Sequence, residues 1–362
     1  MITELFIQNF KGISECRLRN LGQINIFIGK NDSCKSSILE AASTTFGESH
    51  FGFSSGLGNV ISRRSNLPVG GREIFYGYDT TQQIKCNVLL NGRIVSMTAS
   101  YDSNNNQISA TLAIRGLDGK SSESSVVYSS NYGTDFSFRG GSGGNLIEVF
   151  PKEEQKSASS YLRNFRFIDS SSRNDLRLIE DLLGKIKFIG KDVDFGKFLF
   201  EIFGSGLKWE FLPHPDFPNQ YRVTLIENQK RIFLNGLGDG VRFGMLIIAN
   251  SMLSNDTVLF IEEIECNQHP ESLKKLIPFL IEISKKNKLQ LFITTHNPMV
   301  WSCFEKGFAT EAEKDSVLRV FHVKRDSLTG YVNCILQTKK DADKFFSDVD
   351  KDLYGWKEPS NP

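Results

Sequence analysis

The chain has 362 residues, 40% of them hydrophobic, which is enough for one large or two ordinary domains with a real core. Its net charge of +1 gives no overall basic field of the kind that marks a nucleic-acid binder, so only a local basic patch stays open. The six cysteines form no C-x-x-C pair and no metal-ligand spacing with histidine, and no apolar run is long enough to cross a bilayer. We therefore expect a cytoplasmic protein with free thiols and no membrane association.

The first strong pattern is a strand, a loop and a helix near the N-terminus. Residues 3–9 and 15–28 read as strands, and the second run ends with alternating isoleucines. The polar loop GKNDSCKS follows at residues 29–36, and a helix is expected to begin at Lys35. This order of elements is typical of a phosphate-binding loop.

The spacing within the loop is close to that motif. Gly29, Lys35 and Ser36 occupy the first glycine, the lysine and the Ser/Thr of G-x-x-x-x-G-K-[ST]. Cys34 stands where the motif has its second glycine, and it costs about 1–3 kcal/mol of strain if that position requires positive φ. An ordinary strand–turn–helix with a polar turn is the alternative interpretation.

The chemistry of such a loop explains the residue types. Backbone N–H groups turn inward, and the following helix adds its positive N-terminal end. We expect Lys35 to reach the β- and γ-phosphates of a nucleotide and the Ser36 hydroxyl to hold Mg²⁺. The residues predicted to bind nucleotide in this stretch are Gly29, Lys30, Asn31, Asp32, Ser33, Cys34, Lys35, Ser36 and Ser37.

The middle of the chain carries no motif. Residues 72–101 and 107–117 alternate in β fashion, with hairpin turns expected near 90–93 and 104–106. The Gly- and Ser-rich stretches at 47–71 and 119–145 read as loops, residues 152–204 as helical, and residues 208–234 as two strands around a proline-containing turn. The predicted division is a core at 1–46 and 205–345 that carries the phosphate-binding loop, an inserted β-rich subdomain at 47–150, a helical subdomain at 151–204 and a tail at 346–362.

Two buried strands downstream each end in polar residues. Val258–Ile261 is followed by Glu262 and Glu263, and Leu289–Thr294 leads to His296. The amphipathic helix between the two strands implies a parallel crossover. One carboxylate can steady magnesium, the next can polarise a water, and the histidine can bind a γ-phosphate. Surface glutamates and a satisfied strand-end histidine are the alternatives.

A glycine-rich turn, Asn235–Gly240, precedes an apolar helix. A turn of this kind at a helix N-terminus is a second anion site. A plain helix start capped by Asp239 is the alternative. The residues predicted to contact nucleotide here are Asn235, Gly238, Asp239 and Gly240.

In this order, the four segments resemble an ABC-class ATPase head of the RecF/SMC-like group, and most of all the OLD-type ATPases. The resemblance covers about residues 1–46 and 225–345. It implies a P-loop NTPase of class α/β, with an ABC-ATPase-like mixed sheet, helices and an inserted antiparallel β subdomain. The roles it implies are Walker A loop for 29–36, signature motif for 235–240, Walker B acid for Glu262, catalytic glutamate for Glu263, catalytic switch histidine for His296 and a position near the nucleotide for Lys11.

The resemblance also implies partners. Two heads would sandwich ATP in a homodimer or higher oligomer. Neither a Toprim nuclease domain nor a coiled-coil arm is recognisable, so we expect the sensor or motor subunit of a two-component, defence-like system with a separately encoded effector, such as a nuclease. A DNA-repair head and a non-hydrolysing nucleotide-binding scaffold are the alternatives. The candidate DNA contacts are Arg63, Arg64, Arg139, Arg163 and Arg166, with solvated surface as the other interpretation.

Overall fold

A computed structural model describes residues 1–46, 57, 60, 72–105, 107–116, 121–131, 135–139, 146–204, 208–213, 220–227 and 230–354. Across these ranges no helix combines the length and the apolar character that a membrane span needs.

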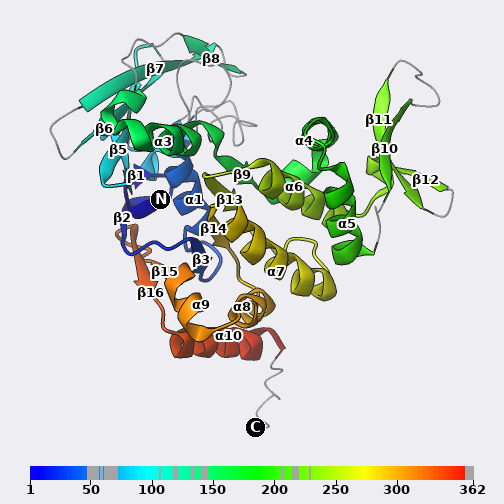
Figure 1. The fold of residues 1–362 in the computed structure, drawn as a ribbon. Helices are drawn as coiled ribbons and strands as arrows, with labels where there is room; N and C mark the ends of the chain where they lie inside the picture. Colours follow the sequence, from blue (N-terminus) through cyan, green and yellow to red (C-terminus); the bar gives the residue numbers. More distant parts are fainter. Residues whose placement is uncertain are drawn as a thin grey trace, which may run out of the picture.

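One mixed sheet of thirteen strands runs through the molecule, in the order β8-β7-β6-β5-β4-β1-β2-β16-β15-β3-β14-β13-β9 (Figure 1). The strands are β1 (Ile2–Phe10), β2 (Ile13–Leu18), β3 (Ile24–Ile28), β4 (Ile84–Leu90), β5 (Arg93–Asp102), β6 (Gln107–Arg115), β7 (Ser121–Asn131), β8 (Asp135–Arg139), β9 (Arg166–Ile168), β13 (Val258–Ile261), β14 (Gln290–Thr294), β15 (Leu318–Arg325) and β16 (Tyr331–Leu336).

The half of the sheet that carries the motifs is parallel. Strand β3 lies between β14 and β15 and runs parallel to both, and β13 runs parallel to β14 and β9. The predicted crossover from β13 through α7 (Pro270–Lys286) to β14 is therefore confirmed. Because parallel strands end at the same edge of a sheet, the carboxyl ends of β3, β13 and β14 meet there.

Side chains of β3 alternate between two hydrophobic clusters, one on each face of the sheet. Phe27 packs on the face covered by α1 (Lys35–Thr44), and its ring stacks on Phe292 with the centroids 6.0 Å apart. Ile24 and Ile26 pack on the opposite face, which α6 (Asp239–Leu253) and α7 cover. Figure 1 shows these helices on opposite sides of the central strands.

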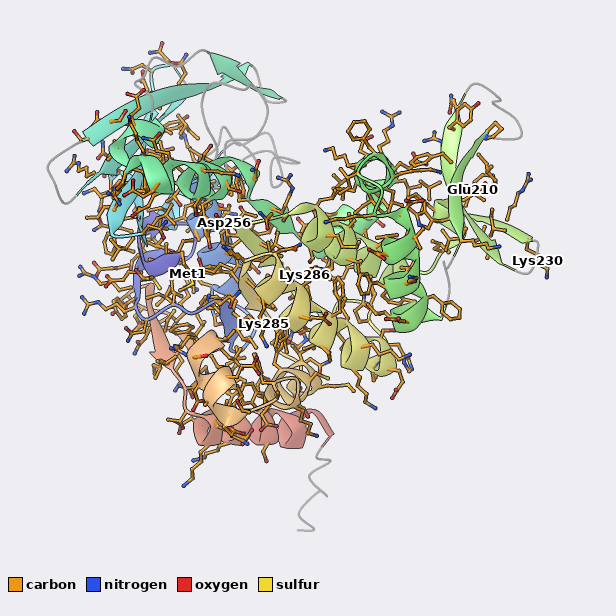
Figure 2. The ribbon with its side chains drawn as sticks, in the orientation of Figure 1. Met1, Glu210, Lys230, Asp256, Lys285 and Lys286 are labelled. Carbon is orange, nitrogen blue, oxygen red and sulfur yellow. The ribbon has the colours of Figure 1, made fainter. Side chains whose placement is uncertain are left out.

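Helices and a smaller sheet complete the fold. Strands β10 (Trp209–Pro213), β11 (Tyr221–Glu227) and β12 (Lys230–Phe233) form a three-stranded antiparallel sheet. Glu210 and Lys230 lie on this sheet, which projects from the side of the molecule (Figure 2). The other helices are α3 (Lys152–Asn164), α4 (Leu176–Phe188), α5 (Asp192–Phe203), α8 (Pro298–Lys306), α9 (Glu311–Val317) and α10 (Lys339–Tyr354).

Several boundaries differ from the sequence prediction. The loop predicted at 119–145 was wrong in part, because it contains β7 and β8; β7 is held by pairing to β6 along its length. The short strand β9 interrupts the predicted helical segment 152–204. Residues 72–78 form short 3₁₀ turns instead of a strand, and residues 15–28 divide into β2 and β3.

Further outcomes concern the middle of the chain. Residues 208–234 contain a third strand, β12, beyond the two predicted. The hairpin at 90–93 is confirmed by the pairing of β4 with β5. Strand β4 also pairs with β1, so the predicted insert continues the main sheet. The domain boundaries themselves stay a prediction, and most of the loop predicted at 47–71 lies outside the described residues.

Candidate nucleotide-binding site

The loop after β3 is built around Gly29. Its φ is +155°, and a Cβ there would lie 2.5 Å from the Val323 carbonyl oxygen and 2.8 Å from the Ser33 Oγ. A larger residue therefore cannot occupy this position without moving β15 or the loop. The loop then exposes Lys30, Asn31 and Asp32 and buries Ser33.

Lys35 points back into the loop. Its Nζ donates hydrogen bonds to the carbonyl oxygens of Gly29 (2.7 Å) and Lys30 (2.9 Å), and the residue is only 8% exposed. Burial lowers the pKa of Lys35, and the nearby carboxylates of Glu263 and Glu265 act against that shift. The ammonium group thus lies close to the acids that follow β13.

Cys34 has the left-handed backbone that the motif's glycine would supply. Its φ and ψ are 70° and 21°, so the strain predicted for a side chain at this position applies, at about 1–3 kcal/mol. The fold makes room for the thiol at Gly12, where a Cβ would lie 2.8 Å from the Cys34 Sγ. Burial raises the pKa of Cys34 to about 11, so the thiol is protonated at neutral pH.

Arg325, at the end of β15, braces the loop and was not predicted from the sequence. Its Nε donates to the Gly12 carbonyl oxygen (2.8 Å), and its Nη1 donates to the Asp32 carboxylate (3.2 Å). No motif marks this arginine. Its position beside the loop depends on the strand order, which places β15 next to β3.

The two glutamates predicted at the end of β13 occupy different positions. The Glu262 backbone N–H donates to the Ile168 carbonyl oxygen of β9 (2.8 Å). The Glu263 backbone N–H donates to the Thr294 hydroxyl of β14 (2.9 Å), and Glu263 has a positive φ of 47°. A left-handed conformation in a residue with a side chain is costly, and such strain concentrates at functional sites.

His296 is held by Glu265, a residue that was not among the site residues predicted from the sequence. Glu265 Oε1 accepts a hydrogen bond from the His296 backbone N–H (2.9 Å) and lies 3.1 Å from His296 Nδ1. The other carboxylate oxygen, Oε2, is buried without a hydrogen-bond partner among the described residues. The ring is about half exposed, so its other nitrogen, Nε2, is available to a ligand.

The predicted signature turn begins α6, on the opposite face of the sheet from α1. Gly238 is the N-cap of α6, and a Cβ on Gly240 would overlap the Asn267 carbonyl oxygen in the segment after Glu263. Each oxygen of the Asp239 carboxylate pairs with one guanidinium group. Oδ2 pairs with Arg173 (3.0 Å), and Oδ1 pairs with Arg242. These hydrogen bonds, that of Arg173 foremost, lower the pKa of Asp239.

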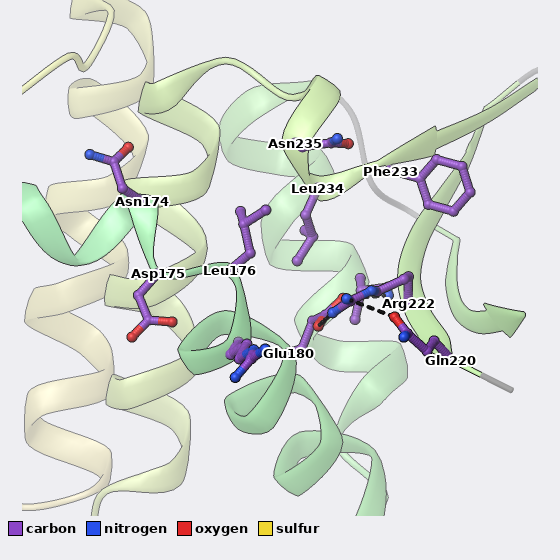
Figure 3. Close-up of a pocket in the computed structure, with 11 residues that line it drawn as sticks. Asn174, Asp175, Leu176, Glu180, Gln220, Arg222, Phe233, Leu234 and Asn235 are labelled. Atoms are coloured by element: carbon purple, nitrogen blue, oxygen red, sulfur yellow. Dashed lines mark hydrogen bonds and ion pairs between the residues drawn. The ribbon is translucent and has the colours of Figure 1, made fainter. Parts of the chain in front are cut away.

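The phosphate loop and the signature turn do not meet within one copy of the chain. No hydrogen bond or ion pair joins residues 29–37 to residues 235–240, both of which the structure describes in full. Asn235 instead lines a separate cavity of about 520 Å³ between α4, the small sheet and the turn (Figure 3). The Arg222–Glu180 ion pair (2.9 Å) lies in the wall of that cavity.

Two other predicted residues have clear partners. The Lys11 ammonium pairs with Glu40, a fully buried acid on α1. Among the candidate DNA contacts, Arg166 donates to the carbonyl oxygens of Asn164 (3.2 Å) and Phe165 (2.9 Å). Arg63 and Arg64 lie outside the described residues, as do the side chains of Arg139 and Arg163.

The loop has the features that a phosphate group requires. The Ser33 hydroxyl is buried without a hydrogen-bond partner in the described part of the chain. The helix that follows has no acidic residue in its first turn, so its N-terminal N–H groups face no competing charge. Ser36 and Glu262 offer the oxygen atoms that Mg²⁺ prefers, while the described residues contain no cluster of three or more metal-ligating groups. Bound Mg²⁺ would neutralise charge on the phosphates.

Comparison with known proteins agrees with this geometry. Residues 145–300 match the model of a family described as the AAA ATPase domain; this segment includes the signature turn and His296 and begins after the phosphate loop. A Helicobacter pylori protein described as an ATP/GTP phosphatase is 22% identical over 326 residues, covering 82% of this chain and 85% of that protein. An uncharacterized Methanocaldococcus jannaschii protein is 63% identical over 41 residues, which cover 11% of this chain and 19% of that protein.

Among solved structures, an SMC head bound to the C-winged helix domain of ScpA superposes with a TM-score of 0.51 and 12% identity. The match covers 94% of this chain and 99% of that one. By this superposition, the chain has the mixed-sheet P-loop NTPase fold of an SMC head. The predicted fold class is therefore confirmed.

Proposed function

We propose that the chain binds ATP with Mg²⁺ and hydrolyses it between two copies of itself. The observation that carries the proposal is the meeting of three strand ends at one edge of the sheet. Lys35 follows β3, Glu263 follows β13 and His296 follows β14, and the Glu263 carboxylate is close enough to act on the pKa of Lys35. Phosphate binding, water activation and a γ-phosphate contact therefore share one location.

The chemistry of each side chain determines its role in nucleotide binding or hydrolysis. Lys35 and the N–H groups at the start of α1 bind the β- and γ-phosphates. Glu263, whose backbone Thr294 fixes, takes a proton from the attacking water. His296 contacts the γ-phosphate through Nε2, with its orientation set by Glu265. Ser36 and Glu262 hold the Mg²⁺.

A second copy of the chain completes the site. The signature turn begins a helix on the opposite face of the sheet from α1, so it cannot cap a nucleotide held by its own phosphate loop without a large rearrangement. Two copies arranged head to head would place each signature turn over the nucleotide of the other. A homodimer, or a higher oligomer built from it, follows from this arrangement.

We further propose that the ATPase is the OLD-type sensor or motor subunit of a two-component defence-like system. This role rests on the motif resemblance, and the separate effector, such as a nuclease, is part of the same proposal. The left-handed Glu263 and the buried Lys35 favour an active site over a non-hydrolysing scaffold. The Helicobacter pylori relative described as an ATP/GTP phosphatase supports hydrolysis and makes GTP the second substrate to test.

The test is turnover of ATP and GTP by the purified chain, with its mass in solution measured with and without nucleotide. Lys35→Ala should abolish nucleotide binding. Glu263→Gln should bind ATP, hydrolyse it at least 100-fold more slowly and accumulate as the dimer. A Glu263→Gln protein that binds ATP and hydrolyses it at the wild-type rate would overturn the assignment.

A further inference from the structure

The signature turn contains a charge that a phosphate-binding element should not have. Asp239 lies in the first turn of α6, and its side chain is 43% exposed. A bare carboxylate there would repel the γ-phosphate of a nucleotide brought up by a second copy. Like charges brought together as water is excluded destabilise the contact strongly.

Two arginines offset this charge. Arg173 Nε donates to Asp239 Oδ2 (3.0 Å), and Arg242, one turn along α6, holds Oδ1. Two guanidinium groups around one carboxylate leave the cluster with a net positive charge. Arg242 Nε is itself buried and has no hydrogen-bond partner among the described residues. The cluster is therefore compatible with an approaching anion.

Arg173 comes from a different element, whose position depends on the strand that carries the catalytic acid. It belongs to the 3₁₀ turn Ser170–Asn174, directly after β9. The Asp169 carboxylate fixes that turn by accepting hydrogen bonds from the Ser172 N–H (2.7 Å) and the Ser171 hydroxyl (2.6 Å). Strand β9 is in turn bonded to β13 and to the Glu262 backbone.

We propose that Arg173 is a positioning residue, which neutralises Asp239 and fixes the signature turn relative to the Walker B strand of the same chain. This inference rests on the proposed function. Arg173 touches neither the nucleotide nor the water, and it acts through the orientation and charge of the turn. The ion pair is partly exposed, so its loss costs little folding stability, and variants should fold.

The experiment compares Arg173→Ala with a matched control, Arg177→Ala. Arg177 lies in the first turn of the next helix, α4, is exposed, and makes no hydrogen bond or ion pair with the described residues. Arg173→Ala should keep wild-type affinity for MgATP, lose ATP-dependent dimerisation in the Glu263→Gln background, and lower turnover about tenfold. Arg173→Lys should recover part of the loss, and Arg177→Ala should behave as wild type.

A double-mutant cycle with Asp239→Asn separates charge neutralisation from general structure. Once the carboxylate is gone, removal of Arg173 should change turnover less than about twofold beyond Asp239→Asn alone. An equal loss in both backgrounds, or identical behaviour of Arg173→Ala and Arg177→Ala, would overturn this inference and leave the proposed ATPase intact. A wild-type protein that neither dimerises with ATP nor hydrolyses it would reject the proposed function, and this inference with it.

Discussion

Glu265 Oε1 holds His296 at two points, the backbone N–H at 2.9 Å and the ring Nδ1 at 3.1 Å. A single carboxylate oxygen therefore fixes both the position and the direction of the imidazole. With Nδ1 occupied, Nε2 is the nitrogen left for a ligand. This arrangement is what a residue that senses a γ-phosphate needs, since its free nitrogen must be aimed before the ligand arrives.

Replacing Glu265 by alanine should therefore impair catalysis without removing nucleotide binding. We expect turnover to fall on the order of 10- to 100-fold, because a small misplacement of a catalytic group has that effect. ATP affinity, measured by titration, should change little, because Lys35 and its loop are not part of this contact. Glu271→Ala is the matched control, since Glu271 is an exposed acid paired with Lys274 on α7. Unchanged turnover in Glu265→Ala would contradict this role.

Replacing Cys34 by glycine should leave activity equal to wild type or higher. Glycine adopts φ of 70° without strain, although it gives up the packing of the thiol at Gly12. These effects oppose one another, so the free energy of unfolding should change by no more than about 1 kcal/mol. Cys34→Ala is the control that keeps the strain and removes the sulfur. A clear loss of turnover in both variants would show that the thiol itself has a role.

The Cys34 thiol also predicts a pH dependence. Its pKa is raised from 9.0 to about 11 in the folded chain, so the folded state disfavours the thiolate. The stability that the protonated thiol contributes to the folded state is fully present below about pH 9 and is lost as the pH rises through 11. Between these pH values, the free energy of unfolding measured with denaturant should therefore fall more in the wild type than in Cys34→Ala. Parallel curves for the two proteins would contradict this, because Cys86 and the other buried thiols are common to both.

Lys11 has two possible roles that can be tested against each other. One is the predicted contact with the nucleotide, and the other is stabilisation of the fold through its ion pair with Glu40. Removing the cation beside the fully buried Glu40 should cost about 3 kcal/mol of unfolding free energy. Arg17→Ala, which breaks the exposed pair with Glu15, should cost less than about 1 kcal/mol. If Lys11→Ala instead keeps full stability and loses ATP affinity, the residue serves the nucleotide. Denaturant unfolding and ATP titration of the same samples decide the question.

The parts of the site that could be predicted from the sequence are those encoded within a few residues. The apolar strand before Gly29 and the acids directly after Ile261 indicate strand ends by local pattern alone. Glu265 and His296 are 31 residues apart, and only the parallel pairing of β13 with β14 brings them together. Arg325 depends in the same way on β15 lying beside β3. Such contacts are set by the order of strands, which no local pattern contains.

In the fold, too, the strands that depend on tertiary pairing could not be predicted from the sequence. Strand β9 has three residues inside a helical pattern, and its conformation is fixed by pairing with β13. Strand β7 contains the serine-rich run SSESS, which has none of the apolar alternation that marks a strand, and β6 supplies its hydrogen bonds. Tertiary pairing overrides weak local preference in both cases.

Gly238 and Gly240 give a last test, because the chain constrains them differently. A Cβ on Gly240 would collide with the Asn267 carbonyl oxygen, so Gly240→Ala should lower the unfolding midpoint of the isolated chain. No atom of the described residues lies within 4 Å of a Cβ on Gly238, whose φ is −62°, so Gly238→Ala should fold with an unchanged midpoint.

Any need for glycine at position 238 must then come from outside the chain. If the turn closes over the nucleotide of a second copy, the added methyl group meets that nucleotide. Gly238→Ala in the Glu263→Gln background should therefore bind ATP but form at least tenfold less dimer at equal concentration, as measured by mass in solution. A Gly238→Ala protein that dimerises as well as its parent would mean that the turn does not approach the partner's nucleotide closely.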